Sequence, residues 1–421
     1  MERSQHRDQI PTAIWKHVLI VSGVSFAYYL ALHVLFQYGI SDQFLFNQPD
    51  AVEYHRVGLS FFNGPLSEST LVRPYLYPLI SVLGYKLFGA IGVWSMQLML
   101  LIASVVLVFV AVLRVTASVR GAWAAAVIML LNFSLFALTY HGLTEVISAC
   151  LGAAIARRVV TAPSKLFSPR IATQVALMLA IASVVKPLFV PFLICWCVVV
   201  GMVALRRRTW RKRNVLMFVL ALAPLLPQLA IMKVQHGRFG ISDIGSHTLK
   251  NYLIARSYGE VHGIPLEEAR PTVVAMDMDE VFNYATGSFS NILKLYAVDM
   301  EDNLYYGGGY TLELVQPPGL SFAPLVMEKT NKVYTVMHVV MLLLGLVVLY
   351  KVMKGMRSPW IGPWILLGAM NYYILLVSGI SFWQGDRLVV FGICIWIVQY
   401  ALTLLLLRGK IETADPNPTL T

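Results

Sequence analysis

Long apolar runs constrain this chain more than any other feature of its sequence. Each run has roughly 17 to 24 residues, which suits a helix that crosses the hydrocarbon of a bilayer. Only 13% of the 421 residues are charged, against about 25% in soluble domains. The sequence therefore predicts an all-α polytopic membrane protein with about ten transmembrane helices, namely Ile14–Gln37, Ile91–Leu113, Ala122–Leu138, Leu143–Val160, Ile171–Val185, Pro187–Leu205, Val215–Ile231, Val333–Tyr350, Trp360–Ile380 and Leu388–Leu407.

Basic residues between the runs predict how the chain lies in the membrane. With a cytoplasmic N-terminus, 20 of the 33 Lys and Arg residues fall in cytoplasmic segments, and only four of the 22 acids do. Short loops rich in Lys and Arg stay on the cytoplasmic side. We therefore predict a multi-pass cell membrane protein with both termini in the cytoplasm. The compact chain favours a bacterial inner membrane, and the distribution of its positive charge argues against a nucleic-acid partner.

This topology predicts three parts in the chain. Residues 1–231 form an N-terminal transmembrane module, whose first outer loop, residues 38–90, contains amphipathic helices. Residues 232–332 form an outer loop between the seventh and eighth spans, where 12 acids and 8 bases alternate with apolar patches. Such mixing is typical of amphipathic helices. Residues 333–421 form a C-terminal transmembrane module with a short cytoplasmic tail.

The apolar segment Tyr75–Ala90 raises the question of an eleventh span. A crossing there would invert every later loop and place the strongly basic stretch 206–213 outside the cell, against the positive-inside rule. We therefore predict a helix that lies on, or dips into, the outer face of the membrane.

Ionisable residues gather at the outer ends of the predicted spans. Charged groups at the edge of a membrane protein are expensive to keep in apolar surroundings and indicate function. The topology brings to one level seven residues from segments that are far apart in the sequence: Asp50, Glu53, Arg73, His141, Glu145, Lys186 and Arg387. The sequence therefore predicts a single site at the outer face.

Five short motifs in these segments resemble the GT-C glycosyltransferase superfamily, and more closely its protein mannosyltransferases and lipid A aminoarabinose transferases. The chain departs from the common pattern of adjacent acids, because Ala51 follows Asp50 and the next acid is Glu53. The matching motifs are Asp50 with Tyr54, RPYLYP at 73–78, HGLTEVISA at 141–149, VVKPLFVPF at 184–192 and GDRL at 385–388.

The resemblance implies a membrane enzyme that transfers a hexosyl or pentosyl group. The donor would be a sugar linked to polyprenyl phosphate, and the acceptor a lipid, a glycan or a protein. Transfer would take place at the periplasmic face, with inversion at the sugar carbon, among membrane lipids that are themselves partners of the chain.

Such a transfer needs a base and fixed cations. A carboxylate takes the proton from the acceptor hydroxyl, and cations stabilise the developing charge of the phosphate. Asp50 is the predicted base, and its alternative interpretation is an N-cap of the helix that follows. Lys186 and Arg387 are the predicted phosphate ligands, with snorkelling at a helix end as the alternative.

The remaining candidates each have two interpretations. Glu53 is a catalytic residue that binds acceptor or metal, or else a solvated helix residue. Arg73 binds the phosphate, or anchors the interfacial helix to lipid headgroups. His141 and Glu145 share one helix face, so they contact substrate or pair with each other. Tyr54 packs beneath the site.

Two other functions remain open on the sequence alone. A polymerase or ligase of lipid-linked glycans would use a diphosphate donor and would also have a large outer loop. A transporter of lipids or glycans would be expected to carry charges near the membrane midplane and internal repeats, and the sequence shows neither pattern.

Metals and disulfides have little support in the sequence. The four cysteines all lie within apolar runs: Cys150, Cys195, Cys197 and Cys394. We therefore expect neither a disulfide nor a zinc site. No dense set of ligands at fixed spacing occurs, so we expect no cofactor, although a divalent metal is compatible with the predicted chemistry.

Overall fold

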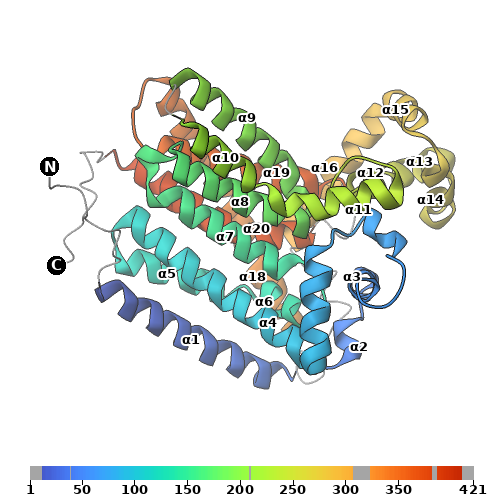
Figure 1. The fold of residues 1–421 in the computed structure, drawn as a ribbon, viewed down its shortest axis with the longest axis horizontal. Coiled ribbons are helices and arrows are strands. Elements are labelled where there is room, and N and C mark those ends of the chain that lie inside the picture. Colours follow the sequence, from blue (N-terminus) through green and yellow to red (C-terminus); the bar gives the residue numbers. More distant parts are fainter. Residues whose placement is uncertain (1–11, 38, 208–209, 307–322, 382–385, 410–421) are drawn as a thin grey trace.

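The computed structural model describes residues 12–409, apart from residues 38, 208–209, 307–322 and 382–385. Every regular element in the described part of the chain is a helix, which confirms the predicted all-α class. Figure 1 shows the long helices packed as a bundle, with shorter helices gathered at one end, on the right.

The bundle consists of helices that follow the apolar runs. Within the described residues, seven helices are long and apolar enough to cross a membrane, or eight if the bent helix pair described below counts as one span. The chain is therefore a multi-pass membrane protein, but helix length and composition do not confirm the expected count of about ten. The bundle as a whole, including helices that do not meet this criterion, is built from α1 (Thr12–Phe36), α4 (Leu76–Thr116), α5 (Val119–Leu130), α7 (Glu145–Thr161), α8 (Pro169–Val185), α9 (Val190–Arg207), α10 (Lys212–Leu220), α11 (Leu226–His236), α18 (Ala323–Met353), α19 (Ile361–Ser378) and α20 (Asp386–Leu407).

One predicted span is broken in the structure. The run Ala122–Leu138 was expected as a single helix, but α5 ends at Leu130, and α6 (Phe133–Ala137) continues at an angle of 55°. The cause is Asn132, whose side-chain oxygen accepts a hydrogen bond from the Leu135 N–H at 2.8 Å. Side-chain capping of this kind ends one helix and begins the next.

Helix α4 bends sharply near the end of the segment that was expected to lie at the membrane face. The backbone leaves the helical conformation at Phe88 and at Gly89, where φ is +62°. Glycine adopts a positive φ without the steric cost of a Cβ atom. Figure 1 shows the light-blue first half of α4 standing across the ends of the long helices, an arrangement consistent with an interfacial helix.

Short helices cover this end of the bundle. In the first outer loop they are α2 (Asp42–Leu45), α3 (Pro49–Ser60) and the 3₁₀ turn Glu68–Leu71. The larger loop forms a group with its own small core of Ile254, Ala255, Val273 and Val281. Its helices are α12 (Ile244–Leu249), the π-helical turn Lys250–Ile254, α13 (Ala255–His262), α14 (Leu266–Ala275), α15 (Met278–Gly287) and α16 (Phe289–Tyr306).

Helix α7 is the centre of the bundle, and its first turn marks the site. It packs against α4, α8 and α20. A Cβ atom at Gly152 of α7 would lie 3.2 Å from the Ile395 side chain of α20, so the small residue lets the two helices approach closely. This packing brings the start of α7, the end of α8 and the start of α20 together.

Candidate active site

Helix α3 carries the first carboxylate of the site, and its close packing on α4 fixes its place. A Cβ atom at Gly58 would collide with the Pro78 carbonyl oxygen of α4, so only glycine permits this approach. Gln48 is the N-cap and Pro49 opens the helix, a favoured place for proline. Asp50 therefore lies within the first turn, where the helix dipole favours a carboxylate, and the N-cap interpretation of Asp50 is wrong.

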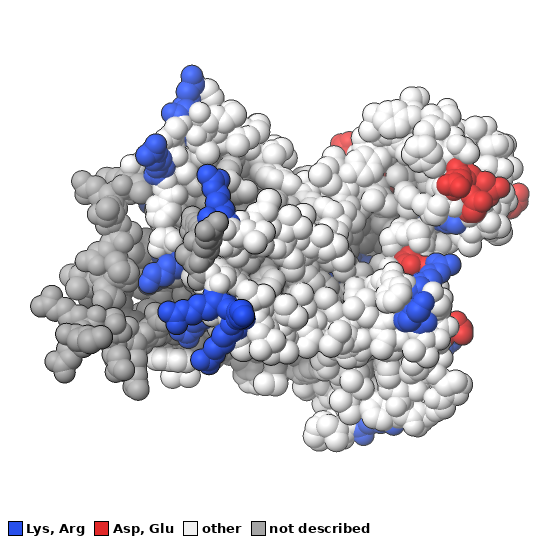
Figure 2. All heavy atoms as spheres, turned by 45° about the horizontal axis from the view of Figure 1, so that its top comes forward, with Lys and Arg blue, Asp and Glu red and all other residues white. Residues whose placement is uncertain are grey.

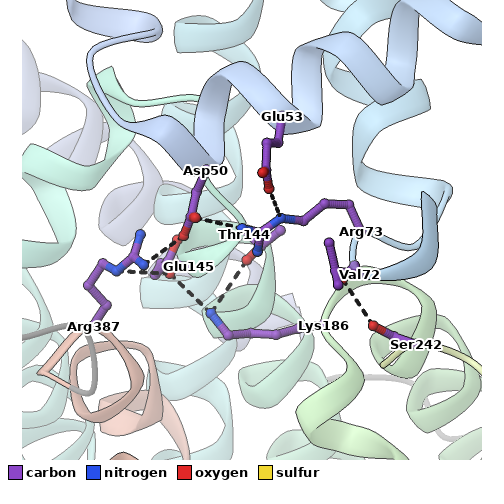
Figure 3. A network of polar contacts seen from close by, with 9 residues as sticks. All are labelled: Asp50, Glu53, Val72, Arg73, Thr144, Glu145, Lys186, Ser242 and Arg387. Carbon is purple, nitrogen blue, oxygen red and sulfur yellow. Dashed lines mark hydrogen bonds and ion pairs between the residues drawn. The ribbon is translucent and has the colours of Figure 1, made fainter. Parts of the chain in front are cut away.

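Two arginines from distant segments hold the Asp50 carboxylate. Arg73 donates to Oδ1 at 2.6 Å, and Arg387, at the start of α20, donates to Oδ2 at 2.8 Å. Figure 3 shows the carboxylate between the two guanidinium groups. Burial alone would raise the pKa of Asp50, but the charges of Arg387 and Arg73 outweigh it and hold the pKa well below its ordinary value. Asp50 is therefore a carboxylate at neutral pH.

A second buried pair lies beside the first. Lys186, in the turn between α8 and α9, donates to the Glu145 Oε1 atom at 3.0 Å and to the Thr144 hydroxyl at 3.4 Å. Arg387 Nε lies 4.0 Å from the same Glu145 oxygen. Arg387 thus faces both carboxylates, Asp50 and Glu145, and joins the two pairs into one network.

Arg73 completes the network on the side of the large outer loop. Its Nε donates to Glu53 at 2.8 Å, and its guanidinium carbon lies 5.0 Å from the centre of the Tyr54 ring. Tyr54 is buried under the site, whereas the Glu53 side chain is 38% exposed. The buried arginine and tyrosine thus support the site, while Glu53 faces its open side.

The network contains equal numbers of acids and bases. Among the described residues its ion pairs join three carboxylates to three cations: Asp50, Glu53, Glu145, Arg73, Lys186 and Arg387. Because buried cations need compensating charge, each carboxylate holds a cation in place. A phosphate that entered would compete with the carboxylates for the same cations.

His141 lies near this network. The sequence had suggested a pair with Glu145 as one possibility, but the two side chains do not pair. The His141 side chain is fully buried, and Gln97 donates a hydrogen bond to its backbone carbonyl. Burial, reinforced by the charge of Arg387, lowers the pKa of His141 to about 4. The imidazole is therefore neutral at pH 7, and Glu145 pairs with Lys186 instead.

A neutral buried histidine predicts a specific acid sensitivity. The folded His141 binds fewer protons than the unfolded residue, so stability falls as pH drops from about 6.5 towards 4. The full effect is roughly 3 kcal/mol at 1.36 kcal/mol per pKa unit. We expect the thermal midpoint of a His141→Asn variant in detergent to fall less over this range than that of the wild type. An unchanged pH dependence, matching that of the exposed-site control His262→Asn, would contradict the assignment.

Three contacts were not anticipated from the sequence. Thr144 accepts a hydrogen bond from Lys186, and it was visible only as part of the HGLTEVISA motif. Phe391 lies under the Lys186 ammonium, with 5.0 Å between the nitrogen and the ring centre. In the sequence, its position one helical turn after Arg387 is the only feature that indicates a place near the site. Gln228 contacts the Arg73 segment and stands in an apolar run without any motif.

Part of the last motif lies outside the described residues. The parts of the GDRL motif at 385–388 that are not described are Gly385 and the side chain of Asp386. Within the described part of the chain, no three His, Cys, Asp or Glu side chains are grouped as a metal site.

The fold and this network together define a polytopic membrane protein with a charged site at the helix ends. No family model matches the chain, and no curated protein matches it. The solved structure of ArnT from Cupriavidus metallidurans bound to undecaprenyl phosphate matches it with a TM-score of 0.51 and 12% identity, over 94% of this chain and 61% of ArnT.

The likeness to ArnT is a likeness of fold, and it supports the all-α membrane architecture that the sequence predicts. The chain spans 61% of the length of that ArnT chain. The apo state of the same ArnT gives a TM-score of 0.36 at 11% identity, over 94% of this chain and 78% of that chain.

Proposed function

We propose that this chain is a membrane glycosyltransferase that uses a sugar linked to polyprenyl phosphate. It transfers a hexosyl or pentosyl group to a lipid, glycan or protein acceptor at the outer face of the membrane, with inversion. The observation that carries the proposal is the Asp50 carboxylate held between Arg73 and Arg387, with Lys186 beside them. The GT-C fold, shared with an ArnT that binds undecaprenyl phosphate, supports the same chemistry.

Lys186 and Arg387 bind the donor phosphate in this proposal. Both cations lie at helix ends and face one another across Glu145. Charge-assisted hydrogen bonds from arginine and lysine are the usual means of binding phosphate. The phosphate takes the place that the carboxylates of Asp50 and Glu145 occupy in the free network, so donor binding needs no additional cation.

Asp50 acts as the base after this exchange. While two arginines hold it, its lowered pKa makes it a weak proton acceptor. Donor phosphate that withdraws Arg387 and adds a negative charge raises that pKa. Asp50 then takes the proton from the acceptor hydroxyl as its oxygen attacks the anomeric carbon. The bond from that carbon to the phosphate oxygen breaks, and polyprenyl phosphate leaves from the opposite face.

The distribution of charge supports an outer location for the site. Figure 2 shows Asp and Glu near the end with the short helices, whereas Lys and Arg lie at both ends and gather mainly at the opposite one. Lys351 caps the end of α20 at the Leu407 carbonyl, and Arg114 reaches the Thr161 carbonyl at the end of α7. The basic end is cytoplasmic by the positive-inside rule, which makes the end with Asp50 periplasmic.

The proposal is tested with the purified full chain in nanodiscs. Undecaprenyl-phosphate sugars are supplied beside the matching undecaprenyl-diphosphate sugars, with a lipid and glycan extract as acceptor. We expect release of undecaprenyl phosphate from the monophosphate donor alone, with label appearing on the acceptor. Consumption of the diphosphate donor would support the polymerase or ligase instead. In a parallel experiment with the full chain in sealed vesicles, movement of intact donor across the bilayer without bond cleavage would support a transporter.

A further inference from the structure

We propose that Gln228 is a positioning residue that fixes the backbone on both sides of Arg73. The function it serves rests on the proposed sugar transfer, because Arg73 holds the Asp50 carboxylate. Gln228 belongs to α11, and its side chain is fully buried. A buried amide in a membrane helix is costly unless its polar atoms are paired.

The amide of Gln228 contacts the chain on either side of Arg73. Its Nε2 donates to the Thr70 carbonyl at 3.2 Å and to the Ile241 carbonyl at 3.0 Å. Its Oε1 accepts from the Tyr75 N–H at 3.1 Å. One side chain therefore joins Thr70, three residues before the arginine, to Tyr75, two residues after it. We call the hydrogen bonds of the Gln228 amide to Thr70, Ile241 and Tyr75 the Gln228 bracket.

A second set of contacts reaches the residues between these points. Ser242 donates from its hydroxyl to the Val72 carbonyl at 3.0 Å, and the Asp243 N–H donates to the Leu71 carbonyl at 2.9 Å. Figure 3 shows Ser242 reaching Val72 next to Arg73. Because Gln228 also holds the Ile241 carbonyl, the same amide places the segment that makes these contacts.

The end of α11 extends the attachment further back along the chain. Gln235 donates to the Leu66 carbonyl at 2.9 Å, and His236 Nε2 lies 2.8 Å from the hydroxyl oxygen of Thr70. The stretch from residue 66 to residue 75 is thus bound to α11 and to the turn that follows it.

Arg73 depends on such support because its own backbone lies outside any helix. The 3₁₀ turn ends at Leu71, and α4 begins at Leu76. The Arg73 N–H donates one hydrogen bond to the Ser69 carbonyl at 2.8 Å, at the end of the 3₁₀ turn. Its guanidinium must meet Asp50 at 2.6 Å and Glu53 at 2.8 Å. A displacement of about 1 Å at a catalytic group can lower a rate by about 100-fold, so the bracket from Gln228 matters for transfer.

The first test measures the bracket itself, without reference to activity. Gln228→Met keeps the volume and removes the amide. We expect hydrogen–deuterium exchange in residues 66–75 of the full chain to rise at least about tenfold, since the Tyr75 N–H loses its acceptor. The control is Gln399→Met, which removes another buried amide, twelve residues beyond Arg387 on α20. Unchanged exchange in Gln228→Met, or an equal rise in the control, would overturn the bracket.

The second test asks whether the bracket acts through Arg73. We expect Gln228→Met to lower kcat for sugar transfer roughly tenfold while the KM for donor stays within about twofold. In an Arg73→Ala background the same substitution should have no further effect, because coupled residues are not additive. Additive losses would show a general structural role and overturn the proposal.

A milder variant, Ser242→Ala, tests the same role if the Gln228→Met protein does not fold. Ser242→Ala removes one contact at Val72, and we expect the same pattern at smaller amplitude, a fall in kcat with faster exchange in residues 66–75. Faster exchange without loss of kcat would overturn the positioning role. If the wild type transfers no sugar, the proposed function fails, whereas the exchange measurement still decides whether Gln228 holds the segment.

Discussion

Replacement of Asp50 by Asn is expected to lower the rate of sugar transfer by about 1,000-fold, near the middle of the range for a lost general base. Asparagine keeps the size of the side chain and one acceptor for Arg387, but it cannot take a proton from the acceptor hydroxyl. Donor binding should persist, because Lys186 and Arg387 remain. The measurement is kcat in nanodiscs, together with the affinity for undecaprenyl phosphate.

The matched control for this variant is Asp42→Asn. Asp42 lies on α2, directly before α3, and accepts a hydrogen bond from the exposed Tyr85 hydroxyl at 2.9 Å. We expect transfer by this control to stay close to that of the wild type. Wild-type transfer by Asp50→Asn, in protein that is folded and binds donor, would remove Asp50 from the role of base.

The second large effect is expected from Arg387→Ala, which should lower kcat/KM for the donor by roughly 100-fold. A hydrogen bond to a charged group contributes about 1.5–3 kcal/mol, and Arg387 faces both carboxylates of the site. Its loss also leaves Asp50 with Arg73 as its remaining arginine. Arg387→Lys should recover part of the loss, because lysine keeps the charge without the planar fork.

Arg170→Ala serves as the control for loss of a positive charge. Arg170 is exposed at the start of α8, at the end of the helix away from Lys186. We expect no change in donor kinetics for this variant. If Arg387→Ala changed kcat/KM for the donor no more than Arg170→Ala does, the assignment of the phosphate to Arg387 would be wrong.

The sequence predicts which residues lie at the same depth of the membrane, because topology alone sets that depth. Apolar run length and the positive-inside rule bring the ends of α7, α8 and α20 to one level, and the structure joins Glu145, Lys186 and Arg387 there. The bond between Arg387 and Asp50 spans 337 positions. No local pattern indicates such a partner, so the pairing itself could not be predicted.

Residue spacing and local composition gave the wrong environment for His141 and missed Gln228, because burial in the fold determines the contacts of both residues. The spacing of His141 and Glu145 suggested a pair on one helix face, but His141 precedes α7 and is neutral. Gln228 was missed because one amide in an apolar run looks like a tolerated polar residue of a span. Only the fold shows that the chain around Arg73 passes beside it.

In the proposed mechanism, a lipid phosphate enters the network and releases Asp50 from Arg387. The most direct measurement is an experimental structure of the full chain in nanodiscs with undecaprenyl phosphate bound. We expect phosphate oxygens within hydrogen-bond distance of Lys186 and Arg387, with Arg387 drawn away from Asp50. A phosphate bound elsewhere, with Asp50 still held by Arg73 and Arg387, would contradict it.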